Sequence, residues 1–537
     1  MTGPPGTGRG SDLIASRRPH PRTPAGVSPT NDTLTVTRPE ASPTTPAQRP
    51  LAGLLGSVDH ELRGDGGVAV TDVAYRSSEA RRGSLFFCVP GTRTDGHDFA
   101  TDAVARGAVA VLVERWIDEL EPSVSQVRVP SVREAMGPVS AEAFGRPAES
   151  MVMVGVTGTN GKTTTTYLME SVFRSAGMVP GVIGTTGVRV DGRPEPLDRT
   201  TPEAPDLHRL LASMLRRGVQ AVAMEVSSHG LHQHRVGGVR FGCGVFTNLS
   251  QDHLDYHRTL EEYFDAKRRL FTPEMAERAA VNHDTPEGRL LANAPAVPTL
   301  TYGVAEDADV RATDVETGAR GLRFRVGAVE VRSRLRGAFN VSNCLAALAA
   351  ARQLGIDDAA TVAGLGAVEG VPGRLEPVEE GQDFLVVVDY AHTPDGIENV
   401  LRSARPLVEG AAGRVLVVFG CGGDRDRTKR PLMGRAATSL ADLSVVTSDN
   451  PRSEDPDAII GQIVPGAREG GGRFVVEPDR RAAIRLALDE ARPGDVVVIA
   501  GKGHETGQEF ADRTIPFDDR LVAAEELREL GGRGASR

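Results

Sequence analysis

Residues 155–164 combine the side chains and the spacing of a phosphate-binding loop. The segment reads Gly-Val-Thr-Gly-Thr-Asn-Gly-Lys-Thr-Thr, overlaps the apolar run 151–156 and opens a helical stretch. A glycine-rich turn between a strand and a helix lets backbone N–H groups hold phosphates, so we expect Lys162 at the terminal phosphates and Thr163 on Mg²⁺. A strict Walker sequence has glycine where Val156 stands. A turn that only caps the helix is the alternative, but the strand, the Gly-Lys-Thr sequence and the helix together favour the phosphate site.

Three further residues have either the chemistry of metal ligands or an ordinary structural role. Glu225 lies in an apolar strand predicted over 221–226, where an unpaired carboxylate would be costly to bury. His253 follows a strand predicted over 244–248, and a lone histidine there is more often a structural hydrogen-bonding group than a ligand. Lys267 lies in a helical stretch, where a lysine is ordinarily a solvated cation. The residues by themselves leave these alternatives open.

The elements that must position these residues follow an α/β pattern of three domains. A small α/β domain is predicted over 51–148, with strands at 84–89 and 109–113. A central domain of the P-loop type is predicted over 149–370, ending where Gly and Pro punctuate the chain. The region 371–537 is predicted to be Rossmann-like, because four strands alternate with helices in the pattern of a parallel sheet: 385–389, 415–420, 443–447 and 496–500.

Ligands of such sheets bind beyond the carboxyl ends of the strands, so the polar loop after each of these four strands is a candidate site. Composition narrows the possible partners. Net charge is −10, and neither sign clusters into a stripe that could follow a nucleic-acid backbone. No apolar run approaches the roughly 20 residues of a membrane span. The four cysteines are scattered, which favours a reducing cytoplasm.

Residues 1–50 are rich in Pro, Thr, Ser and Arg and lack a periodic apolar pattern. Such a segment buries too little surface to offset its chain entropy, so we predict a disordered tail. A transit peptide is the competing interpretation, because the segment is rich in Arg and poor in acidic residues. Its many prolines oppose the amphipathic helix that a transit peptide needs, so disorder is favoured.

The loop Thr157-Gly-Thr-Asn-Gly-Lys-Thr163 resembles that of the Mur ligase family and its relatives, the folylpolyglutamate synthetases. The resemblance extends from about residue 70 to 526 through five further motifs: Met224-Glu-Val-Ser-Ser-His-Gly-Leu231, Thr247-Asn-Leu-Ser-Gln-Asp-His-Leu-Asp255, Gly337-Ala-Phe-Asn-Val-Ser-Asn343, Asp389-Tyr-Ala-His-Thr-Pro394 and Gly420-Cys-Gly-Gly-Asp-Arg425. It implies an ATP-dependent ligase of peptidoglycan precursor synthesis, which activates a carboxylate as an acyl phosphate and couples it to the amine of an amino acid.

By this resemblance, the nucleotide and metal residues receive roles. Catalysis is assigned to Lys162, Lys267, His253, Glu225 and Arg374. Thr163 and Glu225 would hold one Mg²⁺, and His253 and a carbamylated Lys267 a second, because a carbamate supplies the oxygen ligand that an ammonium cannot. ATP would contact Gly158, Thr159, Asn160, Gly161, Lys162, Thr163, Thr164, Asn340, Asn343, Arg374 and Asp389, with His392 a further candidate.

The resemblance also implies two carboxylate-bearing substrates. UDP-N-acetylmuramoyl-L-alanyl-D-glutamate would contact Ser77, Thr92, Arg93, Thr94, Thr200, Thr201, Ser227, Gln233 and Arg235. The motif around Ser77 reads Arg-Ser-Ser where the family usually has Asp-Ser-Arg. Diaminopimelate would contact Arg425, Asp449, Asn450, Pro451, Arg452, Gly501 and Glu505, with Asp449 and Asn450 at the distal ammonium and Arg452 in a fork around the distal carboxylate. In isolation, Asp449–Arg452 would be interpreted as an ordinary turn.

Two other functions compete with this interpretation. A folylpolyglutamate synthetase would need neither the N-terminal domain nor the segment 449–452. A non-catalytic nucleotide-binding regulator would have no use for Lys162, Glu225, His253 and Lys267 together. We therefore expect an enzyme that acts in the cytoplasm as a monomer, with neither nucleic acid nor a membrane as partner.

Overall fold

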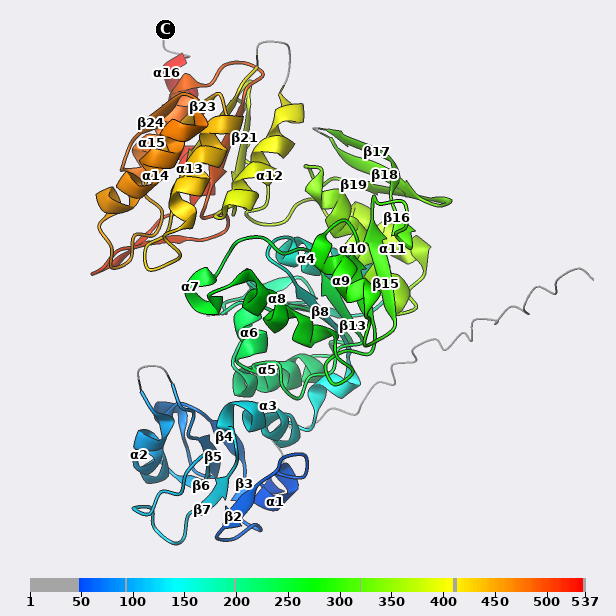
Figure 1. The fold of residues 1–537 in the computed structure, drawn as a ribbon, viewed down its shortest axis with the longest axis vertical. Helices are drawn as coiled ribbons and strands as arrows, with labels where there is room; N and C mark the ends of the chain where they lie inside the picture. Colours follow the sequence, from blue (N-terminus) through cyan, green and yellow to red (C-terminus); the bar gives the residue numbers. More distant parts are fainter. Residues whose placement is uncertain (1–47, 92–93, 198, 319, 409–412, 535–537) are drawn as a thin grey trace, which may run out of the picture. The chain divides into compact units, whose positions relative to one another are not determined.

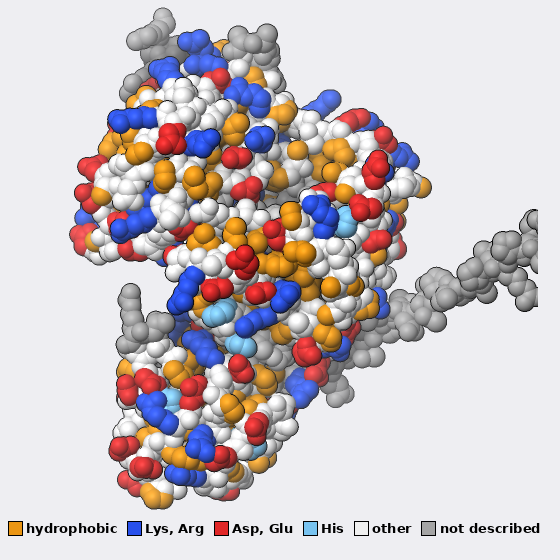
Figure 2. Space-filling view, viewed as in Figure 1, with side chains coloured by type: hydrophobic (Ala, Val, Ile, Leu, Met, Phe, Trp, Pro, Cys, Tyr) orange, Lys and Arg blue, Asp and Glu red, His pale blue; other side chains and the backbone are white. Residues whose placement is uncertain are grey.

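The computed structural model describes residues 48–91, 94–197, 199–318, 320–408 and 413–534. Within these ranges the chain forms three larger sheets flanked by helices, and the predicted α/β fold is confirmed (Figure 1). The described part of the chain has no helix long and apolar enough to cross a bilayer. On the face drawn in Figure 2, basic and acidic side chains are interspersed.

The N-terminal region is built on a five-stranded sheet in the order β2-β7-β6-β5-β4. Apolar side chains from both of its faces are buried, one face against α1 and α3 and the other against α2. The elements of this region are β1 (Arg49–Pro50), α1 (Leu51–Leu54), β2 (Glu61–Arg63), β3 (Ala69–Val70), β4 (Asp72–Ala74), η1 (Ser77–Glu79), β5 (Ser84–Phe87), η2 (Gly96–Phe99), α2 (Ala100–Ala105), β6 (Ala108–Val113), β7 (Ser125–Arg128) and α3 (Val132–Ala143).

The predicted tail of residues 1–50 lies outside the described residues as far as residue 47. Its last two residues differ from the prediction, because Arg49 and Pro50 form β1 and pair antiparallel with β3. This pairing precedes α1, in which Leu51 and Leu54 are fully buried. The ordered part of the chain therefore includes at least these two residues of the predicted tail.

A nine-stranded sheet in the order β11-β10-β9-β12-β8-β13-β14-β15-β16 forms the centre of the chain. Its elements are β8 (Val152–Thr157), α4 (Lys162–Ser175), β9 (Pro180–Gly184), β10 (Gly187–Val190), β11 (Arg193–Glu195), α5 (Ala204–Arg216), β12 (Ala221–Glu225), α6 (Ser228–His232), β13 (Cys243–Phe246), α7 (Leu254–His257), α8 (Leu260–Arg268), β14 (Ala279–Asn282), α9 (Pro286–Asn293), β15 (Thr299–Gly303), β16 (Val310–Arg311), α10 (Phe339–Gln353) and α11 (Asp358–Ala367). A smaller antiparallel sheet follows β16 and consists of β17 (Thr313–Gly318), β18 (Gly321–Val326) and β19 (Val329–Ser333).

Both faces of the central sheet are buried around β8, β12 and β13, which explains why these strands are largely apolar. Val154 and Val156 of β8 pack with α4, α10 and α11, whereas Met153 packs on the other face with α5 and α6. Successive side chains of a strand point to opposite faces, so one apolar run supplies both layers. The predicted strands 151–156, 221–226 and 244–248 are present, with ends shifted by one or two residues.

The C-terminal sheet has the order β20-β21-β25-β22-β23-β24, and β21 to β25 pair in parallel as predicted. One face packs against α12, α13 and α14, and the other against α15 and α16. The elements are β20 (Glu376–Pro377), β21 (Leu385–Asp389), α12 (Pro394–Ala404), β22 (Val415–Phe419), α13 (Lys429–Leu440), β23 (Leu443–Val446), α14 (Pro456–Gly470), β24 (Phe474–Val476), α15 (Arg480–Glu490), β25 (Val496–Ala500), the hairpin β26 (Gly507–Glu509) and β27 (Thr514–Pro516), and α16 (Asp519–Gly534).

Candidate active site

Three parallel strands of the central sheet end at one edge and carry the candidate nucleotide site. In the sheet register, Glu225 of β12 pairs with Val156 of β8, and Phe246 of β13 pairs with Thr157. The loop 158–161 follows β8, and the segment 247–253 follows β13. Strand pairing alone therefore brings the loop, Glu225 and the segment around His253 together, as expected for the carboxyl edge of a parallel sheet.

The loop after β8 adopts a conformation that only glycine tolerates at two positions. Gly158 and Gly161 have φ of 147° and 85°, and a Cβ on Gly158 would lie 1.9 Å from Thr247 Oγ1. Lys162 Nζ donates to the carbonyl oxygens of Gly158 and Thr159 at 2.9 and 2.8 Å. The ammonium therefore folds back over the loop at the start of α4, where a phosphate would meet the helix N-terminus.

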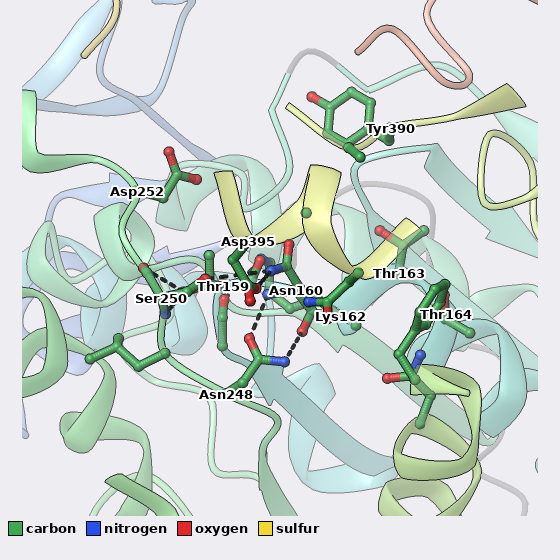
Figure 3. A pocket seen from close by; sticks show the side chains of 18 of the residues that line it. Thr159, Asn160, Lys162, Thr163, Thr164, Asn248, Ser250, Asp252, Tyr390 and Asp395 are labelled. Atoms are coloured by element: carbon green, nitrogen blue, oxygen red, sulfur yellow. Dashed lines mark hydrogen bonds between the residues drawn. The ribbon is translucent and has the colours of Figure 1, made fainter. Parts of the chain in front are cut away.

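Asn160 fixes the outer side of this loop (Figure 3). Its backbone N–H donates to Asn248 Oδ1 at 2.8 Å, and its Nδ2 donates to Asp395 Oδ2 at 2.7 Å. Thr159 Oγ1 lies 3.2 Å from the hydroxyl of Tyr263. The predicted nucleotide residues Thr159 and Asn160 thus take part in a hydrogen-bonded frame as well as lining the cavity.

Glu225 is buried and in contact with the start of α4. Its Oε1 accepts from Thr163 Oγ1 at 2.9 Å and from the backbone N–H of Thr185 at 2.9 Å. Arg374 Nη2 donates to the same Thr163 hydroxyl at 3.0 Å. A hydroxyl, a carboxylate and a guanidinium therefore converge beside the phosphate loop.

Lys267 is not a solvated cation but a fully buried one, with 1% of its surface exposed. Its Nζ donates to the Gly158 carbonyl oxygen at 2.9 Å and lies 4.2 Å from the centre of the Tyr263 ring. Burial, and then the nearby charge of Lys162, hold the pKa of Lys267 well below its usual value. This places an amine with a reduced proton affinity directly behind the loop.

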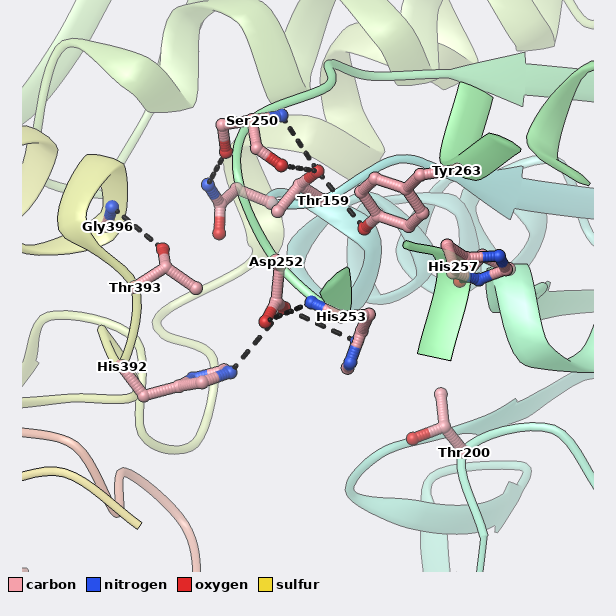
Figure 4. A network of polar contacts seen from close by, with 12 residues as sticks. Thr159, Thr200, Ser250, Asp252, His253, His257, Tyr263, His392, Thr393 and Gly396 are labelled. Carbon is pink, nitrogen blue, oxygen red and sulfur yellow. Dashed lines mark hydrogen bonds and ion pairs between the residues drawn. The ribbon is translucent and has the colours of Figure 1, made fainter. Parts of the chain in front are cut away.

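Asp252, which we did not predict, organises the histidines of the site (Figure 4). His253 Nε2 and His392 Nε2 lie 3.3 and 3.9 Å from Asp252 Oδ2, and Lys429 Nζ lies 3.8 Å from Oδ1. Burial alone would raise the pKa of Asp252, but the neighbouring His253 and Lys429 side chains lower it overall. Burial lowers the pKa of His253 to about 3 and that of His392 to about 4, so both rings are neutral near pH 7 and have free lone pairs for a cation or a donor.

A cavity of about 520 Å³ gathers these groups, which is within the size range of nucleotide-sized ligand sites. Of the predicted nucleotide, metal and catalytic residues, those that line it are Gly158, Thr159, Asn160, Gly161, Lys162, Thr163, Thr164, Glu225, His253, Lys267, Asn343, Arg374, Asp389 and His392. Each oxygen of Asp389 accepts one backbone N–H, from Leu375 and Ala391, both at 2.8 Å. Its remaining lone pairs are available to a ligand.

Asn340 departs from the prediction that both asparagines contact the nucleotide. It does not line the cavity; its Oδ1 accepts from Asn343 Nδ2 at 2.8 Å, and its Nδ2 donates to the Arg336 carbonyl oxygen at 2.6 Å. Asn343 in turn lies against the loop, where a Cβ on Gly161 would come within 2.4 Å of its Oδ1. Residues three apart on α10 are neighbours, so Asn340 braces Asn343 from behind.

The predicted muramoyl-dipeptide residues of the central region also meet at the end of β12. Thr201 Oγ1 donates to the Glu225 carbonyl oxygen at 3.0 Å and lies 3.1 Å from Ser227 Oγ, and Thr200 Oγ1 lies 3.1 Å from Thr185 Oγ1. Arg235 donates to the Thr201 carbonyl oxygen at 3.2 Å. Thr200 and Ser227 line the same cavity as the phosphate loop.

Arg235 belongs to a basic cluster around Glu203 that sequence analysis did not identify. Glu203 is buried and forms ion pairs with Arg133, Arg199 and Arg235 at 2.8, 2.7 and 3.1 Å. Arg235 also donates to Gln233 Oε1 at 2.7 Å. One carboxylate against three guanidinium groups leaves a positive cluster, which suits an anionic ligand.

The N-terminal candidates are only partly described. Ser77 follows β4 and Thr94 follows β5, and these strands are parallel neighbours, so both residues lie beyond the same edge of the sheet. Ser77 is half-buried and Thr94 is exposed. Thr92 and Arg93 lie outside the described residues.

The predicted diaminopimelate residues lie beyond the carboxyl ends of β22, β23 and β25. Arg452 Nη1 donates to the Gly423 carbonyl oxygen at 2.8 Å, which ties the loop 449–452 to the loop 420–425. A Cβ on Gly501 would lie 2.5 Å from Asp449 Oδ2, so the carboxylate packs directly on this glycine. Arg425 is exposed, whereas Asp449, Asn450, Pro451 and Gly501 are buried.

Two details of this loop correct the sequence interpretation. Asn450 Oδ1 already accepts from Lys502 Nζ at 2.8 Å and from the Glu509 N–H at 3.1 Å, so it has no lone pair left for an ammonium. Arg452 is predicted to form a fork around the distal carboxylate, but it is half-buried and its Nε already lies 2.8 Å from Glu509 Oε2. Its remaining N–H groups, on Nη1 and Nη2, are the ones that a ligand carboxylate could use.

Several residues that line the cavity were missed although the quoted motifs contain or adjoin them. Asn248 and Asp252 lie in the motif that carries His253, Tyr390 follows Asp389, and Asp395 follows Pro394. The signal that could have found them is their position in the segments that follow the carboxyl ends of two strands, β13 of the central sheet and β21 of the C-terminal sheet. Tyr263 lies one helical turn before Lys267, a spacing that places the two side chains on one face.

Three segments match the known domains of one family. Residues 69–143 match the Mur ligase family catalytic domain, residues 156–351 the Mur ligase middle domain, and residues 373–503 the Mur ligase glutamate ligase domain. The UDP-N-acetylmuramoyl-L-alanyl-D-glutamate–2,6-diaminopimelate ligase of Geobacillus thermodenitrificans is 49% identical over 83% of this chain and 92% of its own. The chain belongs to the Mur ligase family.

Further ligases and structures of this family and its relatives are similar to the chain at lower identity. The ligase of the same description from Streptomyces avermitilis is 45% identical over 90% of this chain and 96% of its own length. A solved structure described as a UDP-N-acetylmuramoyl-L-alanyl-D-glutamate–2,6-diaminopimelate ligase is 35% identical, with a TM-score of 0.62, and covers 86% of this chain and 96% of that one. Folylpolyglutamate synthase of Mycobacterium tuberculosis, solved with ADP and AMPPCP, is 19% identical with a TM-score of 0.57, covering 73% and 93%, and shares the fold.

Proposed function

We propose that this Mur ligase is an ATP-dependent enzyme that joins diaminopimelate to UDP-N-acetylmuramoyl-L-alanyl-D-glutamate in peptidoglycan precursor synthesis. The two ligases from Geobacillus and Streptomyces are named for that activity, and they match most of the chain. The observation that supports it best is one cavity in which the phosphate loop, Glu225 and Lys267 lie beside Thr200 and Ser227. A nucleotide's terminal phosphate and a substrate carboxylate can meet there.

The chemistry we propose has two steps and needs no protein nucleophile. A carboxylate oxygen of the dipeptide attacks the γ-phosphorus of ATP, and the bond between the γ-phosphorus and the oxygen that bridges it to the β-phosphate breaks. ADP departs, and the carboxylate has become an acyl phosphate. The amine of diaminopimelate then attacks the acyl carbon, and amide, phosphate and a proton are released. Lys162 and Arg374 are cations beside the loop, and they would neutralise the charge that builds up on the phosphoryl oxygens.

The residues around the loop fit Mg²⁺. Thr163 Oγ1 and Glu225 Oε1 are hard oxygen donors 2.9 Å apart at the start of α4, the combination of hydroxyl and carboxylate that Mg²⁺ takes beside nucleotide phosphates. When bound, Mg²⁺ would supply positive charge at the phosphates. His253 and a carbamylated Lys267 would hold a second ion.

Removal of the metal gives a direct prediction. Without Mg²⁺, we expect phosphate release to fall to background, because Lys162 and Arg374 alone would compensate only part of the triphosphate charge that the anionic carboxylate must approach. Titration of the EDTA-treated protein with MgCl₂, followed by phosphate release, tests this. Activity that persists in excess EDTA would contradict the proposed metal site.

The surroundings of Lys267 favour a carbamate on its amine. Its amine is buried, its pKa is lowered by burial, and it lies beside the loop rather than at an acidic partner. A neutral amine adds CO₂ and loses a proton, and the resulting carbamate anion offers the oxygen that a metal ion accepts. The same environment makes an ammonium costly to keep.

We therefore predict that Lys267→Ala loses most activity and that acetate or propionate restores part of it by occupying the position of the carbamate. The measurement is phosphate release by the variant with and without each acid at fixed ionic strength. Arg268→Ala serves as the matched control, because that neighbouring side chain is 62% exposed and pairs only with Asp265 within the described residues. A fully active Lys267→Ala variant would exclude the carbamate.

The substrate groups have separate sets of supporting residues. The basic cluster around Glu203, with Thr200, Thr201, Ser227 and Gln233, would hold the carboxylates of the muramoyl dipeptide, and Ser77 with the loop 92–94 would contact its UDP portion. Asp449 and Glu505 would bind the distal ammonium of diaminopimelate, and Arg425 and Arg452 its carboxylate. One chain supplies all of these groups, so we propose a monomer.

We place this activity in the cytoplasm, because it consumes ATP and because all four cysteines are free and buried. The folylpolyglutamate synthetase alternative shares the fold but leaves the loop 449–452 and the N-terminal sheet without a role. A non-catalytic regulator would leave the buried Lys267 and Glu225 without a role. A phosphate-release assay with ATP, the UDP-muramoyl dipeptide and a panel of amino acids tests the proposal, which predicts release only when diaminopimelate is also present.

A further inference from the structure

Lysine is rare in this chain, and its positions indicate a special use. Only four lysines, at positions 162, 267, 429 and 502, occur among the 62 lysines and arginines. Three of them are buried, with exposures of 1% at Lys267, 5% at Lys429 and 0% at Lys502, and Lys162 lines the cavity. The surface ion pairs of the described residues use arginine or histidine instead. A guanidinium cannot replace a compact ammonium in a tight site, so each of these positions is a candidate for a specific role.

Lys502 is the buried lysine that lies among the proposed amino-acid-binding residues without a role so far. It comes two residues after β25, next to Gly501, and its Nζ donates to Asn450 Oδ1 at 2.8 Å. The same Nζ lies 3.4 Å from Glu505 Oε2. A fully buried cation is costly unless its neighbours compensate it, and here the two compensating side chains are both predicted substrate contacts.

The contact with Lys502 fixes which way the Asn450 amide faces. Asn450 Oδ1 accepts hydrogen bonds from the Lys502 ammonium and from the Glu509 N–H, and Asn450 Nδ2 donates to Glu505 Oε2 at 2.7 Å. Rotating the amide by 180° would direct its NH₂ group at the ammonium and its oxygen at the carboxylate, so only one orientation is favourable. One Nδ2 hydrogen remains for a ligand.

Charge supports the same role. Asp449 is buried, and burial followed by the Asp449 charge raises the pKa of the Glu505 carboxyl, an effect that Lys502 opposes. Arg480 beneath them is already engaged, because it pairs with Asp519 at 2.7 Å. The carboxylates of Asp449 and Glu505, together with the ammonium of Lys502, have a net charge of −1. This charge matches one ammonium group of an amino acid.

We propose that Lys502 is a positioning residue of the amino-acid site, which holds Asn450 and Glu505 so that Glu505 and Asp449 accept the ammonium of the incoming amino acid. The inference rests on the proposed function. It adds Lys502 to the amino-acid site, together with its contacts to Asn450 and Glu505. Lys502 itself does not touch the substrate. Its effect should therefore fall on the binding of the amino acid rather than on the nucleotide.

The test uses the full-length chain and Lys502→Met, which keeps an unbranched side chain and removes the ammonium. We expect KM for diaminopimelate to rise by about 10–100-fold, with kcat at saturating diaminopimelate and KM for ATP changed less than about threefold. Asn450→Ala should raise the same KM. The double variant should have a KM for diaminopimelate no higher than that of the more impaired single variant, because both substitutions break the same contact between Lys502 and Asn450.

Arg414→Met is the matched control. Arg414 is a largely buried cation of the same sheet, but it pairs with Asp495 at the amino ends of β22 and β25. This variant should lower the melting temperature by a similar amount and leave KM for diaminopimelate unchanged. An unchanged KM in Lys502→Met, an equal rise of KM for ATP, or fold-changes that multiply in the double variant would overturn the proposal. Wild-type protein that shows no release dependent on diaminopimelate would overturn the proposed function, and this inference with it.

Discussion

Replacing Lys162 with alanine should lower kcat/KM for ATP-driven coupling by about 10³-fold, or about 4 kcal/mol at roughly 1.4 kcal/mol per decade. The ammonium lies over the loop, 2.8 Å from the Thr159 carbonyl oxygen, and a bound terminal phosphate would attract it away from these carbonyls. Its removal takes away charge compensation at the atoms where phosphoryl transfer occurs. The measurement is phosphate release with all three substrates.

A control for this variant comes from the same helix. Arg174 lies in the last turn of α4, is 48% exposed and pairs with Glu170, so Arg174→Ala should keep nearly full activity. Circular dichroism and thermal unfolding would show whether either substitution disturbs the fold. Undiminished product formation by Lys162→Ala would exclude the loop as the site of phosphoryl transfer.

The second large effect concerns the choice of amino acid. Wild-type protein should use diaminopimelate over L-lysine by about 10²–10³-fold in kcat/KM, because lysine lacks the distal carboxylate that Arg452 and Arg425 would bind. Arg452→Ala should raise KM for diaminopimelate by about 10–100-fold, since a hydrogen bond to a charged group contributes about 1.5–3 kcal/mol. The expected loss is moderate because Arg452 is half-buried and Glu509 already pairs with it.

The pattern across substrates separates this role from a structural one. Arg452→Ala should leave KM for ATP and the low activity with L-lysine nearly unchanged, so the preference for diaminopimelate should fall by the same factor of about 10–100. Arg513→Ala, which removes an exposed guanidinium from the neighbouring hairpin, should change neither. If wild-type protein used both amino acids comparably, the loop 449–452 could not be the element that selects them.

Much of the fold and of the nucleotide site followed from the sequence, because both depend on local patterns. Apolar runs such as 496–500 predicted buried parallel strands, and parallel pairing then requires their following loops to share an edge. The glycine-rich segment 155–164 predicted a turn between a strand and a helix, and in the structure Gly158 and Gly161 have positive φ in that turn. The association of Glu225 with Thr163 was implied by the family resemblance, and the structure explains it, since β12 is the neighbour of β8.

The details that the sequence did not predict depend on contacts between distant segments. Asn450 and Lys502 are 52 positions apart, and only their pairing shows that Asn450 braces the site instead of binding an ammonium. Asn340 belongs to a motif of the resemblance, yet its amide is used by Asn343 and the Arg336 carbonyl oxygen. Glu203 collects arginines from α3, from the segment before α5 and from the segment after α6, and no single stretch of sequence reveals that cluster.

The acyl phosphate can be tested most directly by following one oxygen atom. We would supply UDP-N-acetylmuramoyl-L-alanyl-D-glutamate with ¹⁸O in its glutamate carboxylates, together with ATP and diaminopimelate, and analyse the released phosphate by mass spectrometry. Attack of the carboxylate on the γ-phosphorus transfers one carboxylate oxygen to the phosphate, so the account predicts one ¹⁸O per phosphate from fully labelled substrate. Phosphate free of ¹⁸O, formed along with the coupled product, would contradict activation of the substrate as an acyl phosphate.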